Sequence, residues 1–204
     1  MLLESHGGEA TEGFLSMAIK APRAGESMPL LDPKRGRSMC DRVFFYPDGR
    51  KETFTLYQYT GPVSSIIFPL TSNNEVVAVR QFRHGINGVL LELPGGSPEG
   101  SQSVEDAATA ELLQETGYQA EKVVMLGAAV WFEPALINTR FMPVLGLGCR
   151  KVKESEPEKN EVLETVVVPL EEWYRKIWNG EVIDAKSIAL SFLAMPLTGI
   201  KPAR

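Results

Sequence analysis

The sequence predicts an α+β protein in which helices cover a β-sheet in an α/β/α arrangement. Strand-like runs dominate residues 41–80, a single helix follows a Gly- and Pro-rich loop, and further strands precede two terminal helical segments. This grouping differs from the regular alternation of a βαβ series. No internal repeat is visible in the 204 residues.

The chain is predicted to begin with an irregular arm and a small β subdomain. Residues 1–38 mix Gly, Ser, Pro and charged residues without a regular pattern. Within residues 39–62, the runs Arg42–Tyr46 and Thr53–Tyr59 are joined through the turn sequence Pro47-Asp48-Gly49. These residues are therefore expected to form an N-terminal β-hairpin.

Two strands and a loop are expected next. Apolar runs at Ser64–Leu70 and Glu75–Arg80 are separated by a polar turn. The run Leu90–Leu93 leads into Pro94–Gly100, which is too rich in Gly and Pro to be a helix or a central strand.

The first helix is predicted over residues 104–116. Ser103 is a suitable N-cap, Asp106 follows three residues later, and Gly117 provides a stop signal. The second half of the chain continues with strands at Lys122–Leu126, Arg140–Leu145 and Leu163–Val168, a charged loop at 151–161, and helical periodicity at Leu170–Trp178 and Ala185–Met195.

Composition excludes several classes of protein. Hydrophobic residues make up 44% of the chain and charged residues 23%, as in ordinary globular proteins. The formal net charge of −5 gives no general attraction to nucleic acid or to an acidic membrane. No signal-like start and no apolar run of roughly 18 residues is visible. The protein is expected to be soluble and cytoplasmic, with no membrane or nucleic-acid partner.

Paired acids on the predicted helix are the most informative chemical feature. Glu111 and Glu115 are four residues apart and therefore share one helical face. Mg²⁺ prefers oxygen ligands and often combines one or two carboxylates with substrate phosphates. A backbone carbonyl of the Gly95-Gly96 loop would complete such a site. From spacing alone, the solvated face of an amphipathic helix is the more common explanation of such a pair.

The segment from Gly96 to Tyr118 resembles the Nudix box. The matching positions are Gly96, Glu111, Leu112, Glu115 and Gly117. Three positions depart from the box, because Gln102 stands at the first Glu, Ala110 at the Arg, and Gln114 at the first residue of the Glu pair. An amide offers only a neutral oxygen, and Ala110 cannot pair with a carboxylate, so weaker metal binding and poorer preorganisation are expected.

The resemblance extends over roughly residues 40–198. Val79–Arg83, Leu91–Gly96 and Gly180–Ala185 look like segments of ADP-ribose and related nucleoside-diphosphate-sugar pyrophosphatases. The resemblance to these pyrophosphatases implies a Nudix fold over residues 63–198, with a mixed β-sheet in an α/β/α sandwich, and a tail at 199–204. It also implies a homodimer to which the N-terminal strands contribute.

Site roles follow from the same resemblance. The expected metal site consists of Gly95, Glu111 and Glu115, and it would bind Mg²⁺ or, alternatively, Mn²⁺. Glu115 is also expected to be a catalytic residue. Glu161, in the acidic loop after the box, would position or deprotonate water, with Glu164 in reserve. Candidate substrate contacts are Arg80, Arg83 and Glu99, and Trp131 or Phe132 could stack on a base.

The predicted function is metal-dependent hydrolysis of a nucleoside diphosphate linked to another moiety, such as ADP-ribose or a related nucleotide sugar. The alternative is a weak or inactive Nudix-fold protein that still binds a nucleotide. A purely structural or interaction module would bind no nucleotide.

Overall fold

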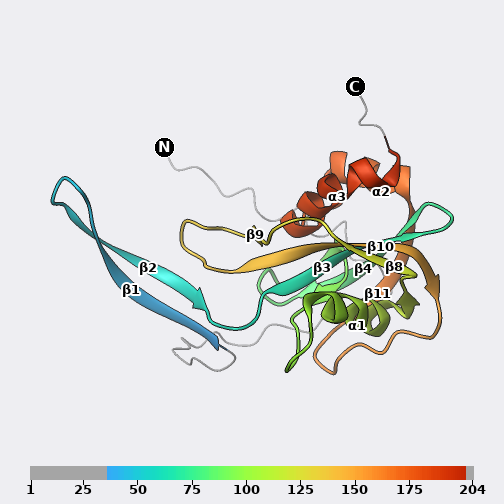
Figure 1. Ribbon diagram of the computed structural model, residues 1–204, viewed down its shortest axis with the longest axis horizontal. Coiled ribbons are helices and arrows are strands. Elements are labelled where there is room, and N and C mark those ends of the chain that lie inside the picture. Colours follow the sequence, from blue (N-terminus) through green and yellow to red (C-terminus); the bar gives the residue numbers. More distant parts are fainter. Residues whose placement is uncertain (1–35, 201–204) are drawn as a thin grey trace.

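A computed structural model describes residues 36–200 (Figure 1). Almost all of the predicted arm and residues 201–204 of the predicted tail lie outside the described residues. The strands are β1 Arg37–Phe45, β2 Lys51–Tyr59, β3 Ser64–Thr71, β4 Glu75–Arg83, β5 Gly88–Glu92, β6 Gly95–Gly96, β7 Tyr118–Gln119, β8 Lys122–Met125, β9 Val130–Trp131, β10 Arg140–Lys151 and β11 Leu163–Pro169. The helices are α1 Val104–Thr116, α2 Leu170–Trp178 and α3 Ala185–Thr198.

The N-terminal hairpin forms as predicted and extends away from the main body (Figure 1). β1 and β2 pair antiparallel over nine residues each, from Arg37↔Tyr59 to Phe45↔Lys51. Gly49 adopts a φ of +85° and donates its N–H to the carbonyl of Tyr46, which closes the turn. Both strands are longer than the apolar runs because polar cross-strand pairs continue the ladder.

The main sheet is mixed. Its principal strand order is β11-β4-β3-β10-β7, with β5, β6, β8 and β9 paired at its margins. β3 and β10 run parallel, whereas β4 pairs antiparallel with β11 and β5. The parallel central pair is buried on both faces, as its continuous apolar runs require.

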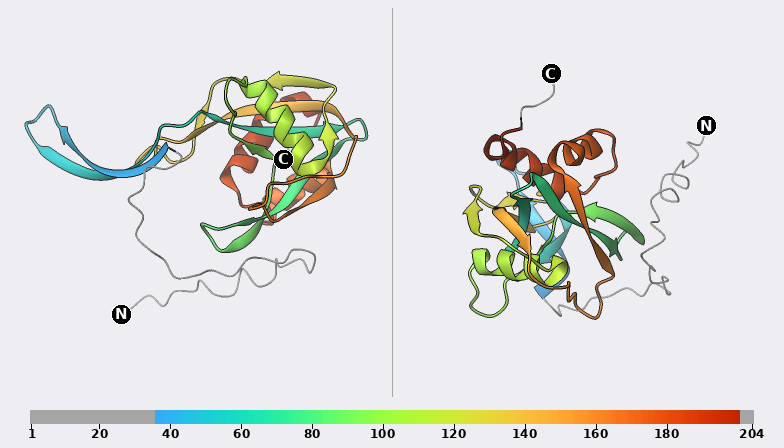
Figure 2. Two further views of the ribbon diagram at one scale, coloured as in Figure 1. Left: turned by 90° about the horizontal axis from the view of Figure 1, so that it is seen from below. Right: turned by 90° about the vertical axis from the view of Figure 1, so that its right-hand side faces the viewer.

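Helices cover both faces of this sheet, as Figures 1 and 2 show, and the predicted α/β/α sandwich is confirmed. α1 packs one face through Ala108 and Leu112 against Ile67 and Val144. α2 and α3 pack the other face, where the indole of Trp173 is fully buried. Within residues 36–200, no helix is both long and apolar enough to cross a membrane.

Some predicted boundaries were wrong. β4 continues to Arg83 and pairs with β5, and the loop at Pro94–Gly100 contains the short strand β6. A Cβ on Gly95 would lie 2.3 Å from the carbonyl oxygen of Ser65, so only glycine permits this close pairing of backbones. α3 runs to Thr198 and ends at Gly199, although Pro196 inside its last turn has no N–H to donate to the preceding turn.

The ends of α1 follow their predicted signals. The Ser103 hydroxyl accepts the N–H of Asp106, and Gly117 ends the helix with a φ of +75°. The N–H groups of Val152 and Lys153 both donate to the Gly117 carbonyl. The charged loop at 151–161 is thereby held against the C-terminal end of α1.

Gly117→Ala is expected to destabilise the protein by about 2–4 kcal/mol, because a left-handed alanine is strained and its Cβ adds a backbone clash. That Cβ would lie 2.1 Å from the carbonyl oxygen of Lys153. Gly100→Ala is the control, since Gly100 also has a positive φ of +55° but has nothing within 4 Å of the added Cβ. Urea unfolding measures both variants, and equal losses would contradict the role given to the loop contact.

Candidate active site

Glu111 and Glu115 face the Gly95-Gly96 loop from α1. Glu115 is only 2% exposed, and its Oε2 accepts the N–H of Gly95 at 3.1 Å. A Cβ on Gly96 would lie 1.9 Å from Glu111 Oε1, so the missing side chain leaves the space that this carboxylate fills. The paired acids therefore belong to a packed site and are not merely a solvated helical face.

Negative charge converges on these two carboxyl groups. Burial raises the pKa of Glu111 to about 7, and the charges of Glu161, Glu158 and Glu99 add to the effect. Burial also raises the pKa of Glu115 well above its ordinary value, and repulsion from Glu111 and Glu161 raises it further. The N–H of Gly95 and the charge of Arg83 act in the opposite direction.

This convergence predicts a pH-dependent stability of the metal-free protein. Because the folded pKa of Glu111 is about 7 against an ordinary 4.5, its stabilising contribution is present below pH 4.5 and is lost as pH rises through 7. The melting temperature in chelator should fall over this interval, and the fall should be smaller in Glu111→Gln. A variant profile parallel to that of the wild type would contradict the assignment.

The site fits a divalent cation. Within residues 36–200, no three His, Cys, Asp or Glu side chains form a complete metal centre by themselves. Mg²⁺ commonly uses only one or two protein carboxylates and completes its shell with water and phosphate oxygens. A dication would also relieve the repulsion that raises both pKa values.

The acidic loop supplies two further carboxylates beside α1. The Glu156 N–H donates to the Gln114 carbonyl at 2.7 Å, which docks the loop on the helix. Glu161 Oε2 accepts the Glu158 N–H at 2.9 Å, and the Glu161 N–H donates to the Glu158 carbonyl. The reserve acid Glu164 instead lies on β11, where it pairs with Arg80.

The two candidate arginines of β4 have different surroundings. Arg80 donates from Nη1 to Glu164 Oε1 at 3.1 Å, across neighbouring strands. Arg83 donates from Nε and Nη2 to the two carboxylate oxygens of Glu92, at 2.8 and 2.7 Å. Because side chains alternate along a strand, the two arginines lie on opposite faces of the sheet. The charge of Arg83 acts on Glu115.

An aromatic pocket of about 360 Å³ adjoins the box loop. Tyr57 and Tyr59 of the hairpin, Phe132 and Arg140 contribute to its walls. Ser97, the residue after Gly96, also lines it. Its hydroxyl lies 2.9 Å from that of Ser64, another lining residue. Through Ser97 this pocket therefore adjoins the box loop, whose Gly96 packs against the Glu111 carboxylate.

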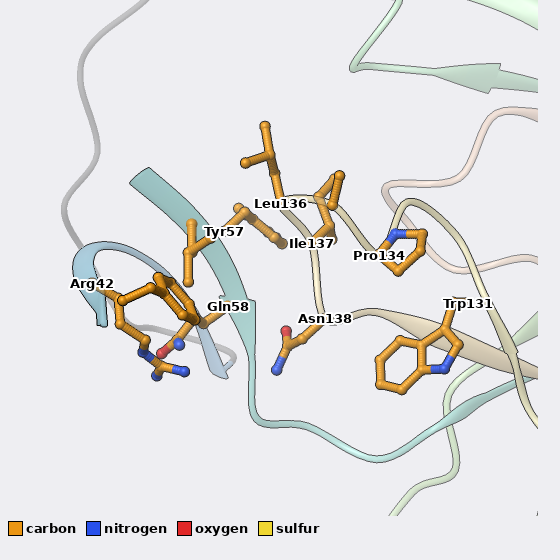
Figure 3. A pocket seen from close by; sticks show the side chains of 11 residues that line it. Arg42, Tyr57, Gln58, Trp131, Pro134, Leu136, Ile137 and Asn138 are labelled. Carbon is orange, nitrogen blue, oxygen red and sulfur yellow. The ribbon is translucent and has the colours of Figure 1, made fainter. Parts of the chain in front are cut away.

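A second pocket, of about 300 Å³, lies between the hairpin and the loop after β9. Figure 3 shows Arg42 and Gln58 on the hairpin side, with Trp131 and Leu136 across from them. Tyr57 and Ile137 line both pockets and form an isolated bridge between the hairpin and the loop.

Comparison with known proteins identifies the family. The NUDIX domain family matches residues 60–190, which is more than half of the chain. This chain belongs to the NUDIX family. A relative named ADP-ribose pyrophosphatase, from Bacillus subtilis (strain 168), is 26% identical over 151 residues, covering 73% of this chain and 80% of the relative.

Two more comparisons agree with this assignment. A relative named ADP-sugar pyrophosphatase, from Mus musculus, is 43% identical over 63 residues, or 31% of this chain and 28% of the relative. The crystal structure of an ADP compounds hydrolase has a TM-score of 0.71 at 18% identity, covering 81% of this chain and 90% of that one, and supports the fold. The predicted Nudix fold and ADP-ribose pyrophosphatase-like branch are confirmed.

The three altered positions of this Nudix box lie at the edge of the site. The exposed Gln102 accepts the Glu99 N–H at 2.9 Å, and its own N–H donates to the Glu99 carbonyl. Ala110 is exposed, and Gln114 is half-buried. Gln102 therefore shapes the loop that carries Glu99, whose charge acts on Glu111.

Sequence reasoning missed two charged residues of the ion-pair network that includes Arg83. Glu92 is fully buried and is contacted by Arg83 and by Lys186, whose Nζ lies 3.5 Å from Glu92 Oε2. A carboxylate within the apolar run Leu90–Leu93 was the available signal, because unpaired acids are rarely buried. Lys186 gave no such signal, since it lies in the first turn of a helix far along the chain.

Proposed function

We propose that this Nudix protein hydrolyses ADP-ribose or a related nucleotide sugar with Mg²⁺, or with Mn²⁺. The family and the relatives confirm the broader prediction, hydrolysis of a nucleoside diphosphate linked to another moiety. One observation carries the finer proposal. Ser97, in the wall of the aromatic pocket, directly follows Gly96, against which the Glu111 carboxylate packs.

The acidic side chains have separate roles in this reaction. Glu111 and Glu115 would hold the divalent cation together with the Gly95 carbonyl, and a bound cation would supply positive charge to neutralise the diphosphate. Glu161 orients a water molecule and accepts its proton as the water oxygen attacks one phosphorus. The bridging P–O bond breaks, and two monophosphates are released.

The remaining site residues bind the substrate. Tyr57, Tyr59 and Phe132 offer aromatic faces for a nucleobase, and Arg140 offers a donor for phosphate or ribose oxygens. Arg83 presents positive charge near the acids, and Glu99 acts on Glu111 through its charge. Arg80 pairs with Glu164 on the opposite face of the sheet from Arg83, so it has no role in this proposal. Both relatives named above are pyrophosphatases of ADP-linked sugars by name, which supports an adenine nucleotide.

A homodimer in the cytoplasm completes the proposal. The hairpin extends from the main body, and the apolar side chains that it exposes include Met39, Val43 and Phe45, the last of which is 73% exposed. A second copy that covers this face would bury these side chains and bring its own residues close to the pocket.

A substrate panel tests the proposed function. ADP-ribose, other nucleotide sugars, dinucleotides and nucleoside triphosphates are incubated with Mg²⁺, Mn²⁺ or chelator, and phosphate is measured after phosphatase treatment. ADP-ribose is expected to be turned over faster than the triphosphates, and only with metal. Preference for a triphosphate would overturn the proposed substrate.

A nucleotide-binding protein without turnover is the second candidate. Ala110 favours it, because no arginine extends from this exposed position towards a carboxylate. Gln102 and Gln114 favour it as well, since both lack the charge that attracts a cation. Saturable binding of ADP-ribose with no turnover at high protein concentration would establish this function.

Restoring the box with Gln102→Glu, Ala110→Arg and Gln114→Glu is expected to raise kcat/KM about tenfold at low Mg²⁺, because two carboxylates and an orienting arginine are regained. None of the three positions is buried, so the fold should accept the changes. Steady-state kinetics over a Mg²⁺ series measures the gain. An unchanged Mg²⁺ dependence would show that these substitutions do not limit the reaction.

A further inference from the structure

Glu92 is a buried acid to which the reaction described above gives no role. Its side chain is 0% exposed. Arg83 contacts both of its oxygens, and Lys186 Nζ lies 3.5 Å from one of them. The Arg83 side chain is 38% exposed, so only the carboxylate of this pair is fully buried. Burial of a carboxylate is costly even when it is paired, and the pair contributes little net stability, which points to another role.

The forked contact fixes the guanidinium of Arg83. Two parallel N–H···O bonds define both the position and the plane of the group. The carboxylate is held in turn, because Lys186 also pairs with Asp184, the N-cap of α3. Asp184 Oδ2 accepts the hydroxyl of Ser187, and that hydroxyl accepts the Leu93 N–H at 2.8 Å, next to Glu92.

The fixed guanidinium lies on the same face of the sheet as the Nudix acids. Arg83 shares its face of β4 with Val79, because the two residues are four positions apart on one strand. Thr165, the cross-strand neighbour of Val79, donates its hydroxyl to the backbone carbonyl of Glu115 at 3.3 Å. The charge of Arg83 also acts on the Glu115 side chain.

Two carboxylates therefore compete for one arginine. Glu92 takes Nε and Nη2 of Arg83, which leaves Glu115 without a direct ion pair to that side chain among the described residues. An arginine that paired directly with Glu115 would occupy the oxygens that a divalent cation needs. Ala110 removes the arginine that the box usually provides, so Arg83 is the cation that faces this acid.

We propose that Glu92 is a positioning residue that holds Arg83 beside Glu115 but out of direct contact with it, so that Glu115 stays open to the metal and is still oriented by a positive charge. This assignment rests on the proposed function of the site, and it makes Lys186 the second cation that balances Glu92. Supporting groups of this kind typically change metal affinity or activity about 10–100-fold.

Mn²⁺ affinity of the full chain, measured by electron paramagnetic resonance, tests this proposal without turnover. Glu92→Gln should weaken Mn²⁺ binding about tenfold, because the released Arg83 pairs with Glu115. The double variant Glu92→Gln with Arg83→Gln should regain most of that affinity, because the competing cation is gone, while kcat stays low. If the Arg83–Glu92 pair had only a structural role, removing Arg83 as well would not restore Mn²⁺ binding.

Arg83→Lys is the second variant, in case Glu92→Gln does not fold. A lysine keeps the charge but cannot make the fork, so Mn²⁺ binding should again weaken. Ser191→Ala is the matched control, since it removes a buried 2.8 Å hydrogen bond to Trp173 on the other face of the sheet. It should lower stability and leave the Mn²⁺ Kd unchanged.

Two results would overturn the proposal. One is a Mn²⁺ Kd within twofold of the wild type in the folded Glu92→Gln protein, or in Arg83→Lys if the first variant does not fold. The other is a double variant that binds no better than the single one. Failure of the proposed function is seen separately, as a wild-type protein that binds Mn²⁺ but turns over no nucleotide in the panel.

Discussion

Replacing Glu115 with glutamine is expected to lower kcat/KM for ADP-ribose about 1,000-fold, because an amide is a poor ligand for the cation that neutralises the diphosphate. The same change should raise the melting temperature of the metal-free protein at pH 8. Glu115 is 2% exposed, and burial together with repulsion from Glu111 raises its pKa well above the ordinary value. Its ionised form therefore costs stability, and glutamine removes that cost.

A fall in kcat/KM together with a rise in melting temperature distinguishes an acid needed for function from one needed for stability. Kinetics at saturating Mg²⁺ and calorimetry in chelator measure them on the same preparation. Asp106→Asn serves as the control, because Asp106 lies on the exposed first turn of α1. Retention of more than a tenth of the activity in Glu115→Gln would refute its assignment as a metal ligand.

Glu161→Gln is expected to lower kcat at least about 100-fold with little change in KM, because the reaction loses the group that takes a proton from water. Glutamine keeps an oxygen to accept the Glu158 N–H, so the loop should remain docked. Steady-state kinetics with ADP-ribose measures the split between kcat and KM.

Two neighbouring acids give the controls for this result. Glu154 is exposed and pairs with Lys151, so Glu154→Gln should leave kcat unchanged. Glu164 pairs with Arg80 on β11, so Glu164→Gln should have only a small effect on kcat. If Glu164→Gln lost activity while Glu161→Gln kept it, the water-positioning role would belong to β11.

The sequence was sufficient for features with local causes. The Ser103 cap and the Gly117 stop lie within one short segment, and α1 forms at the predicted residues. The turn around Gly49 likewise identified the hairpin. The shared face of Glu111 and Glu115 follows from helical geometry, and the structure adds that the Gly95-Gly96 loop closes over them.

Features that depend on distant pairing were not predictable in this way. Arg83 was a candidate substrate contact on its strand, yet its partner Glu92 lies on β5, which becomes its neighbour only through the β4–β5 pairing. Lys186 reaches the same carboxylate from α3. The loop contact of Gln102 depends on a turn that its residue type does not specify. Such contacts form only once the chain has folded.

The most direct test of the account is turnover of ADP-ribose by the wild-type chain with Mg²⁺ and with chelator, measured in ¹⁸O-labelled water with mass spectrometry of the products. Two monophosphates, one of them carrying a single ¹⁸O, are expected with Mg²⁺, and none in chelator. Saturable binding of ADP-ribose without labelled monophosphate, at protein concentrations that would reveal slow catalysis, would contradict it.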